Sequence, residues 1–203
     1  MLRTPTLCFL LVLSSSVAAG HHEAAENEAP GALDPDAMME AAAAAMTPGA
    51  EHAHLADSVG AYNAAMKFWM APGEPALTSS MSVQREMDLG GRVLTERWRG
   101  MAFGQPFEGV GRTGYDNVNK RYWSTWTDTF STGVLVMYGT VSADGQTLEF
   151  TGTGTNPATG ESYKTRSVGS LPGAAVETMT MYEDHGEGEY KSMSVTLTPK
   201  AAP

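Results

Sequence analysis

Cysteine is almost absent from this sequence. The one cysteine among the 203 residues, Cys8, lies within an apolar stretch near the N-terminus, so the rest of the chain has none. Disulfides, thiolate metal ligands and a cysteine nucleophile are therefore excluded for that part of the chain. Its stability must come from a packed core, and the chain is long enough to give one domain such a core.

Basic residues are also scarce. Thirteen Lys and Arg stand against 23 Asp and Glu, which gives a formal net charge of −10 at pH 7. Binding to nucleic acid or to an anionic lipid surface depends on clustered Lys and Arg. This imbalance excludes nucleic acid as a partner.

Long apolar runs are missing except for a short one near the N-terminus. Arg3 precedes the apolar stretch Leu7–Leu13, and small residues follow it. This order is typical of a secretory signal peptide that is cut after Ala19 or after Gly20. The stretch is too short to span a bilayer of about 30 Å, and no later segment predicts a membrane span. We therefore expect a signal peptide over residues 1–19 and a secreted or periplasmic protein.

The segment after the signal changes character twice. Residues 20–35 are acidic, rich in Ala and poor in large apolar side chains, which predicts a disordered tail. Asp36 is the expected N-cap of a short helix, and Thr47 with Pro48 predicts the start of a second one. The helical segment thus covers residues 36–58. The narrow apolar stripe of the second helix favours packing against one end of the β-structure, as a lid or plug.

From residue 59 to 200 the chain alternates apolar and polar residues in short runs separated by turns; Met193, Val195 and Leu197, for example, alternate with Ser and Thr. A period of two predicts strands with one buried and one solvated face. Short loops make consecutive strands antiparallel neighbours, and closure of the sheet removes its exposed edges. We therefore predict an all-β fold, an antiparallel up-and-down β-barrel of about ten strands. These are expected at 60–70, 79–88, 92–102, 106–115, 121–129, 133–142, 146–154, 161–170, 175–183 and 189–198.

Several short motifs are distinctive in this region. They include Met66–Gly73 (MKFWMAPG), Tyr122–Asp128 (YWSTWTD) and Asn156–Glu161 (NPATGE). On these motifs the chain from Val59 to Lys200 resembles the family catalogued as domain of unknown function 1579. The resemblance implies a bacterial protein with a lipocalin-like, calycin-type β-barrel. The family has no established activity, so the resemblance supplies no catalytic residues.

Motifs for cofactors and metals are weak. The glycines from Gly109 to Gly114 match the dinucleotide fingerprint by letter, but they lie inside a predicted strand and do not open a helix. His185 lies in an acidic run that lacks the calcium-loop spacing and is typical of a solvated hairpin tip. His52 and His54 are two residues apart, so they point in different directions on a helix. We predict no cofactor.

One speculative metal site lies in the tail. If the signal is cut after Ala19, the mature chain begins Gly20-His21-His22. A free amine, two amides and an imidazole in that order suit square-planar Cu(II) or Ni(II). Cleavage after Gly20 removes the motif. Adventitious binding of copper by a His-rich tail is the simpler interpretation, so we assign no metal.

Charged residues also occur among the alternating ones. In the strand at 92–102, Arg97 and Arg99 share one face and Glu96 lies on the other. Neither face is purely apolar, which places at least one charged residue at the barrel mouth or inside. Arg112 and Arg166 raise the same question. An interior Arg would pair with a carboxylate or meet an anionic ligand head group, whereas ion pairs across an exposed face are the simpler interpretation.

Large aromatic side chains run through the same strands, and a barrel of this size can be filled by them or can hold one small ligand. Our first hypothesis is therefore a barrel that binds a small apolar or amphipathic molecule, with an Arg at its mouth. A cavity of about 300 Å³ or more would favour it. The candidate ligand-binding residues are Trp98, Phe107, Tyr122, Trp123, Trp126, Asp128 and Arg112.

Two alternatives remain open. One is an enzyme with acid–base groups inside the barrel, for example Asp128 with Tyr122. The other is a filled barrel that acts through its surface as a structural or interaction protein. The sequence leaves the ligand and the oligomeric state open.

Overall fold

A computed structural model describes residues 34–201 as two short helices followed by ten strands. The predicted signal peptide and most of the predicted tail lie outside these residues, as do His21 and His22. Every strand has both ends within two residues of its predicted range. The elements are α1 (Pro35–Met46), α2 (Ala50–Ala56), β1 (Gly60–Phe68), β2 (Leu77–Asp88), β3 (Val93–Ala102), β4 (Gln105–Asp116), β5 (Arg121–Asp128), β6 (Leu135–Val141), β7 (Thr147–Thr155), β8 (Ser162–Ser170), β9 (Glu177–Asp184) and β10 (Tyr190–Pro199).

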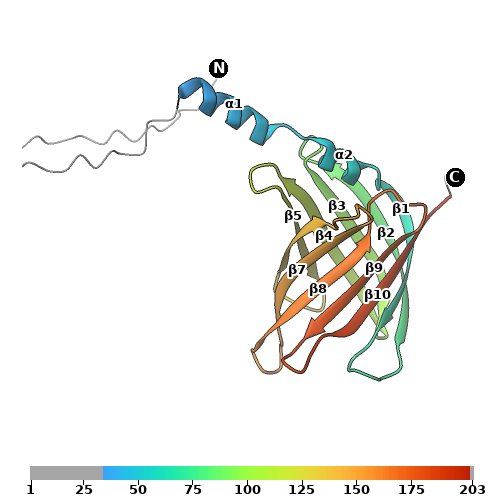
Figure 1. Cartoon of the computed structure of the whole chain (residues 1–203). Helices are drawn as coiled ribbons and strands as arrows, with labels where there is room; N and C mark the ends of the chain where they lie inside the picture. Colours follow the sequence, from blue (N-terminus) through green and yellow to red (C-terminus); the bar gives the residue numbers. More distant parts are fainter. Residues whose placement is uncertain (1–33, 202–203) are drawn as a thin grey trace, which may run out of the picture.

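The ten strands form one closed antiparallel barrel (Figure 1). Each strand pairs with its neighbours in sequence, and β1 pairs with β10 to close the sheet, with Ala64 opposite Leu197. Closure gives every strand a partner on both sides, which removes the exposed edges of an open ten-stranded sheet. The predicted up-and-down barrel is thus confirmed.

Glycines inside the strands make room for large rings on the neighbouring strand. Trp126 on β5 lies over Gly109 and Gly111 of β4, and a Cβ atom at Gly109 would be 2.5 Å from its ring. Trp123 lies over Gly114 in the same way, on the opposite face. Close approach is one of the uses of glycine in strands, and it lets β5 carry two tryptophans.

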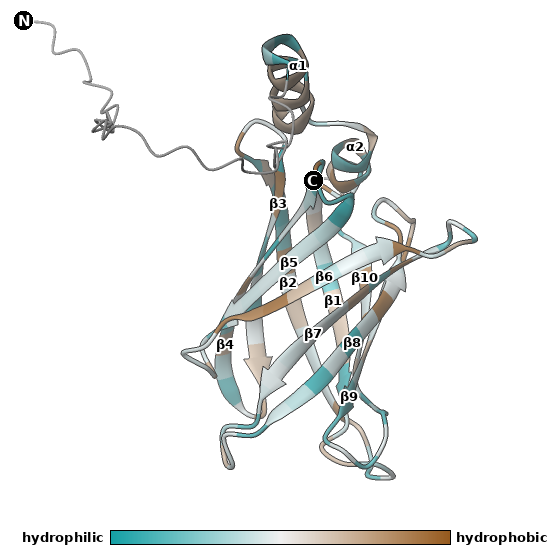
Figure 2. Cartoon of the chain, turned by 60° about the vertical axis from the view of Figure 1, so that its left-hand side comes forward, coloured by the Kyte–Doolittle hydropathy of each residue, from teal (hydrophilic) through white to brown (hydrophobic). Residues whose placement is uncertain are grey.

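Helix α2 covers one end of the barrel, which we call the closed end. It packs against β2, β3 and β4, and its own His52 and Leu55 side chains are buried in this contact. Leu55 is 1% exposed and joins Leu94, Tyr122 and Leu148 in a cluster inside the barrel. The predicted packing of a helix as a lid is confirmed for α2. Helix α1 has no buried residue and projects from the end of the barrel (Figure 2), where its last carbonyls accept hydrogen bonds from Arg92 and Asn117.

Helix α1 begins earlier than predicted. Its N-cap is Asp34, whose side chain accepts a hydrogen bond from the Asp36 backbone N–H, and Pro35 takes the first helical position. Proline is favoured at that position, which places the cap one residue before it. The prediction of Asp36 as the cap is therefore wrong, because Asp36 lies within the first turn.

Helix α2 does not begin at Thr47–Pro48. Thr47 ends α1, and its hydroxyl donates a hydrogen bond to the Ala43 carbonyl. The N-cap of α2 is Gly49, whose backbone N–H donates to Nδ1 of His52 at 3.0 Å. The predicted cap at Thr47 is wrong because its hydroxyl already serves the preceding helix.

Candidate functional site

A cavity of about 380 Å³ lies inside the barrel. Its wall is formed by inward-pointing side chains of the strands, which alternate with side chains on the outer surface. Most of the wall is apolar, with methionines from β1, β6, β9 and β10 facing a cluster of aromatic rings. The ordered aromatic rings and the space between them make this the candidate site.

Aromatic rings extend from the middle of the cavity toward the end of the barrel opposite α2, which we call the open end. Trp98 meets Trp126 edge to face at a centroid distance of 5.9 Å, and Phe107 stacks on Trp126 at 6.4 Å. Phe130 continues the series, 5.1 Å from Phe107 and 6.1 Å from Phe103. Such pairs add specific ring contacts to their burial and hold a cavity wall in one arrangement.

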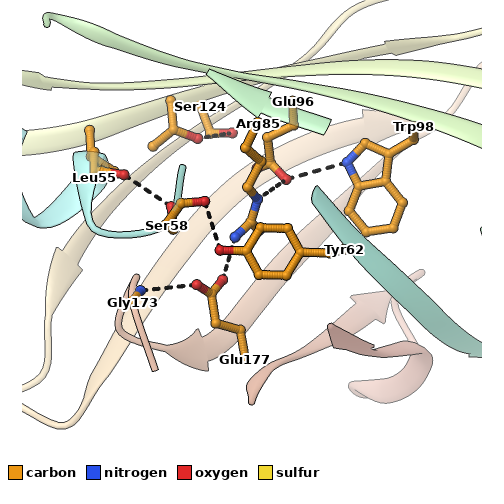
Figure 3. Close-up of polar contacts among 10 residues, drawn as sticks. Leu55, Ser58, Tyr62, Arg85, Glu96, Trp98, Ser124, Gly173 and Glu177 are labelled. Atoms are coloured by element: carbon orange, nitrogen blue, oxygen red, sulfur yellow. Dashed lines mark hydrogen bonds and ion pairs between the residues drawn. The ribbon is translucent and has the colours of Figure 1, made fainter. Parts of the chain in front are cut away.

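Toward the closed end the interior becomes polar (Figure 3). Arg85 on β2 is 6% exposed and lies between two carboxylates. Its Nε is 3.0 Å from Glu96 Oε2 on β3, and one terminal nitrogen is 2.5 Å from Glu177 Oε2 on β9. The Tyr62 ring lies under the guanidinium, 4.9 Å from its centre. A buried arginine needs such partners, because an unpaired charge in the interior is very costly.

Further hydrogen bonds fix these three charged groups. The Trp98 indole N–H donates to Glu96 Oε2 at 3.3 Å, and the Gly173 backbone N–H donates to Glu177 Oε1 at 2.9 Å. Burial lowers the pKa of Arg85, but the two carboxylates raise it more, so that it lies above its ordinary value and the guanidinium stays charged. Burial, together with Glu177, raises the pKa of Tyr62, which keeps its phenol protonated.

The network also reaches the lid. The Tyr62 hydroxyl donates to the Ser58 carbonyl at 2.8 Å, and the Ser58 hydroxyl donates to the Leu55 carbonyl at 3.0 Å. Both hydrogen bonds are drawn in Figure 3. Ser58 is completely buried, so the chain between α2 and β1 is anchored to the polar group beneath it.

A second, wider pocket of about 720 Å³ forms the mouth at the open end. It is built from the β1–β2 connection, the β7–β8 turn and the β9–β10 hairpin. Phe68, Met181 and Met193 line both this pocket and the interior cavity. These three side chains therefore form the boundary between the mouth and the cavity.

The structure divides the predicted wall residues into two groups. Trp98, Phe107 and Trp126 line the cavity, as does Asp128. The Asp128 carboxylate accepts hydrogen bonds from the Trp126 indole at 2.6 Å and from the Phe130 backbone at 2.8 Å. It therefore orients the ring that forms the middle of the wall.

Three other candidates lie elsewhere. Trp123 and Arg112 alternate with cavity-lining residues of their strands, so they lie on the outer surface. Tyr122 points inward but belongs to the cluster under α2, where burial raises its pKa to about 12. Trp123 and Arg112 therefore point away from the cavity and do not fit the predicted role as ligand contacts. Alternation in the sequence alone did not show which face of these strands points inward.

Asp128 and Tyr122 do not form an acid–base pair. They share one face of β5, but they are six positions apart along the strand. At about 3.3 Å per residue this places them about 20 Å apart along the strand. Asp128 is near the open end and Tyr122 near the closed end, so the example of an enzymatic pair taken from the sequence is not assembled.

Outer-surface arginines pair across strands, as the simpler interpretation predicts. Arg97 lies 3.7 Å from Glu86, and Arg99 lies 3.6 Å from Glu108. Arg166 makes two hydrogen bonds to Glu189, which raise its pKa. These arginines are therefore surface partners and not ligand contacts.

The interior arginine was missed, although a signal for it is present. Arg85 shares a face of β2 with Met81, Val83 and Met87, and the neighbouring residues on the other face are polar. A charge on an otherwise apolar face predicts an interior position. No such signal marks Glu177, which stands at the first position of its strand.

Metal and membrane features are limited in the described part. Between residues 34 and 201 no cluster of three or more His, Cys, Asp or Glu side chains is arranged to hold a metal ion. His185 lies in the β9–β10 hairpin, stacked on Tyr163 at 4.3 Å and 3.0 Å from Glu183. Neither described helix is long and apolar enough to cross a membrane.

Comparisons with known proteins place the chain by fold and by family. A family model described as "Protein of unknown function (DUF1579)" matches residues 47–198, which span the barrel and α2. The crystal structure of Rv2717c from M. tuberculosis is similar over 76% of this chain and 100% of its own, with a TM-score of 0.54 and 15% sequence identity. At that identity the likeness shows the fold alone. A search of curated proteins gave no match.

Proposed function

We propose that this chain, which belongs to the family described as protein of unknown function (DUF1579), binds one small apolar or amphipathic molecule inside its barrel. The interior cavity of about 380 Å³ carries the proposal. Sites for small molecules have volumes of about 300–1,000 Å³, with mostly apolar walls and a few polar groups. A barrel filled by its own aromatic side chains would leave no space of this size.

Two further features support a binding role. The mouth at the open end shares Phe68, Met181 and Met193 with the cavity, which gives a ligand an apolar route inward. The aromatic rings of the wall are held by one another and by Asp128. A pre-formed wall lowers the entropy lost on binding. We also propose that the ligand is met outside the cytoplasm, because the N-terminal stretch is typical of a secretory signal.

A titration with an apolar fluorescent dye tests the proposal. Ser167 of β8 is 8% exposed and lines the cavity, so Ser167→Phe places a ring in the open space. Val168 is the next residue, on the outer face, and Val168→Phe serves as the matched control. We expect saturable dye binding that weakens about tenfold or more in Ser167→Phe and is unchanged in Val168→Phe. A decrease of 1.4 kcal/mol in binding free energy corresponds to a tenfold change.

Tryptophan emission gives an independent measurement. Trp126 lies on the cavity wall and Trp123 on the outer surface. Ligand binding should change the emission of the protein and of Trp123→Phe, and the change should be smaller in Trp126→Phe. Dye binding that is saturable and equal in the protein and in Ser167→Phe, or no saturable binding at all, would contradict a ligand in the cavity.

A further inference from the structure

The only arginine that lines the described cavity is already neutralised. Arg85 contacts Glu96 at 3.0 Å and Glu177 at 2.5 Å, and its pKa is raised by both. Its side chain is 8% exposed. The three groups carry a net charge of −1, so a ligand carboxylate at the guanidinium would be a third anion beside a single cation. A buried charge without a partner of its own costs several kcal/mol, and like charges held side by side disfavour each other.

Acceptors, in contrast, are available at the same place. The Glu96 side chain is 17% exposed, about twice the 8% of Arg85 and of Glu177. Its Oε2 accepts two hydrogen bonds, from Arg85 and from Trp98. Its Oε1 receives no hydrogen bond from any residue between 34 and 201, and Glu96 lines the cavity. A carboxylate oxygen with a free lone pair is a strong acceptor for a ligand donor.

Ser167 is a second polar group without a protein partner. It is 8% exposed and lines the cavity, and its hydroxyl makes no hydrogen bond within the described part of the chain. Its oxygen is not among the buried side-chain atoms without a partner in the described part, which are Arg121 Nε and Thr165 Oγ1, so the hydroxyl is open to the cavity. A hydroxyl in that position can exchange hydrogen bonds with a bound ligand.

Acidic side chains outnumber basic ones both inside the cavity and at the mouth. Inside, the described cavity wall carries one cation, Arg85, and two carboxylates, Glu96 and Asp128. A third carboxylate, Glu177, lies behind the wall and is paired with Arg85. At the mouth the lining residues include Glu183 and Glu187, and one described cation lies beside them, Lys191, whose amine is 4.1 Å from the ring of the lining Trp69. A cleft lined by one sign of charge attracts the opposite sign and repels its own.

We infer that the ligand is an amphiphile whose head group donates hydrogen bonds, as a protonated amine or a hydroxyl does, and that it is not a carboxylate. The inference rests on the proposed function and specifies its ligand class. Glu96 is six residues from Ala102, the cavity-lining residue at the open end of β3. This corresponds to about 20 Å of strand. The head group therefore lies deep, near Glu96, and the apolar body lies among Trp98, Phe107 and Trp126 toward the mouth.

Octylamine, octanol and octanoate test the inference, because they share one chain and differ only in the head group. Their binding to the unaltered protein is measured by dye displacement near neutral pH. We expect octylamine to bind more tightly than octanol, and octanoate to bind at least about tenfold more weakly than octanol. The comparison uses the unaltered protein, so its result does not depend on the folding of a variant.

A pair of variants assigns the effect to one side chain. Glu96→Gln keeps the shape of the side chain and removes its charge, and it should weaken octylamine about tenfold while octanol changes little. Glu86→Gln, on the outer face of β2 beside Arg97, is the matched control and should alter none of the three affinities.

The outcomes separate the inference from the proposed function. Octanoate binding that equals or exceeds that of octanol would overturn the donor head group and leave a binding barrel in place. An equal effect of Glu96→Gln and Glu86→Gln on octylamine would overturn the deep position of the head group. Failure of the dye and of all three octyl compounds to bind saturably would refute the proposed function itself.

Discussion

Replacement of Arg85 by methionine tests whether the closed end depends on its buried charges. Methionine has a similar length but no charge, so Arg85→Met leaves Glu96 and Glu177 without their cation. Removing one partner of a buried ion pair costs about 3–5 kcal/mol. The hydrogen bonds from Trp98 and Gly173 remain and offset part of the loss. We therefore expect the free energy of unfolding to fall by about 4 kcal/mol, a large share of the ~5–15 kcal/mol typical of a domain.

The measurement is urea unfolding followed by tryptophan emission at neutral pH. In the triple variant Arg85→Met, Glu96→Gln, Glu177→Gln, part of the lost stability should return, because no buried charge is then left without a partner.

Two results would refute this reasoning. A deficit below about 1 kcal/mol at neutral pH would mean that the carboxylates are solvated well enough without Arg85, in conflict with a cost of several kcal/mol for an unpaired buried charge. A deficit that is the same in the single and the triple variant would mean that the loss comes from packing and not from charge. Either result would also weaken the argument that Arg85 is unavailable to a ligand.

Three further predictions concern the lid, the cavity wall and the closed end. Leu55→Ala should lower the free energy of unfolding by about 2–5 kcal/mol, whereas Met39→Ala on the exposed α1 should change it by less than about 0.5 kcal/mol in the same urea titration. Gly109→Ala would place a Cβ 2.5 Å from the Trp126 indole, so it should lower the free energy of unfolding by about 1–3 kcal/mol and weaken dye binding. Gly133→Ala, in a loop, is the control, and equal effects of the two changes would contradict the close approach. Burial raises the pKa of Tyr122 to about 12, so the stability it contributes is complete below about pH 10 and is lost as pH rises toward 12. Tyr122→Phe should therefore lose less stability than the protein over that interval, and identical alkaline profiles would contradict this.

The strands were predictable because two signals agree along the chain. Alternation sets each strand, and glycine-rich turns such as Leu89-Gly90-Gly91 set its ends; Gly90 and Gly91 both adopt positive φ. The helix starts were not predictable to the residue. Asp34 and Asp36 are both acceptable caps, and only the helical position of Pro35 decides between them.

Wall residues were predictable only where the face of the strand was clear. Trp98 alternates with Arg97 and Arg99, which marks it as inward. In β5 aromatic residues occupy both faces, since Trp123 and Trp126 are three residues apart, so alternation cannot assign an inner face there. The register with β4 decides it, because Gly109 and Gly111 leave space on the inside.

The proposed ligand class depends on a contact that no local pattern contains. The sequence shows Arg85 as a charge on the apolar face of β2, and such a residue is expected either to pair with a carboxylate or to meet an anionic head group. Its partner Glu177 is 92 residues away in sequence, and two strands, β1 and β10, separate β2 from β9 in the barrel. Only closure between β1 and β10 brings the two side chains together under α2. Closure therefore pairs the one arginine of the described wall with two carboxylates, the first of the two alternatives that the sequence left open for an interior arginine, and this pairing is what the proposed donor head group rests on.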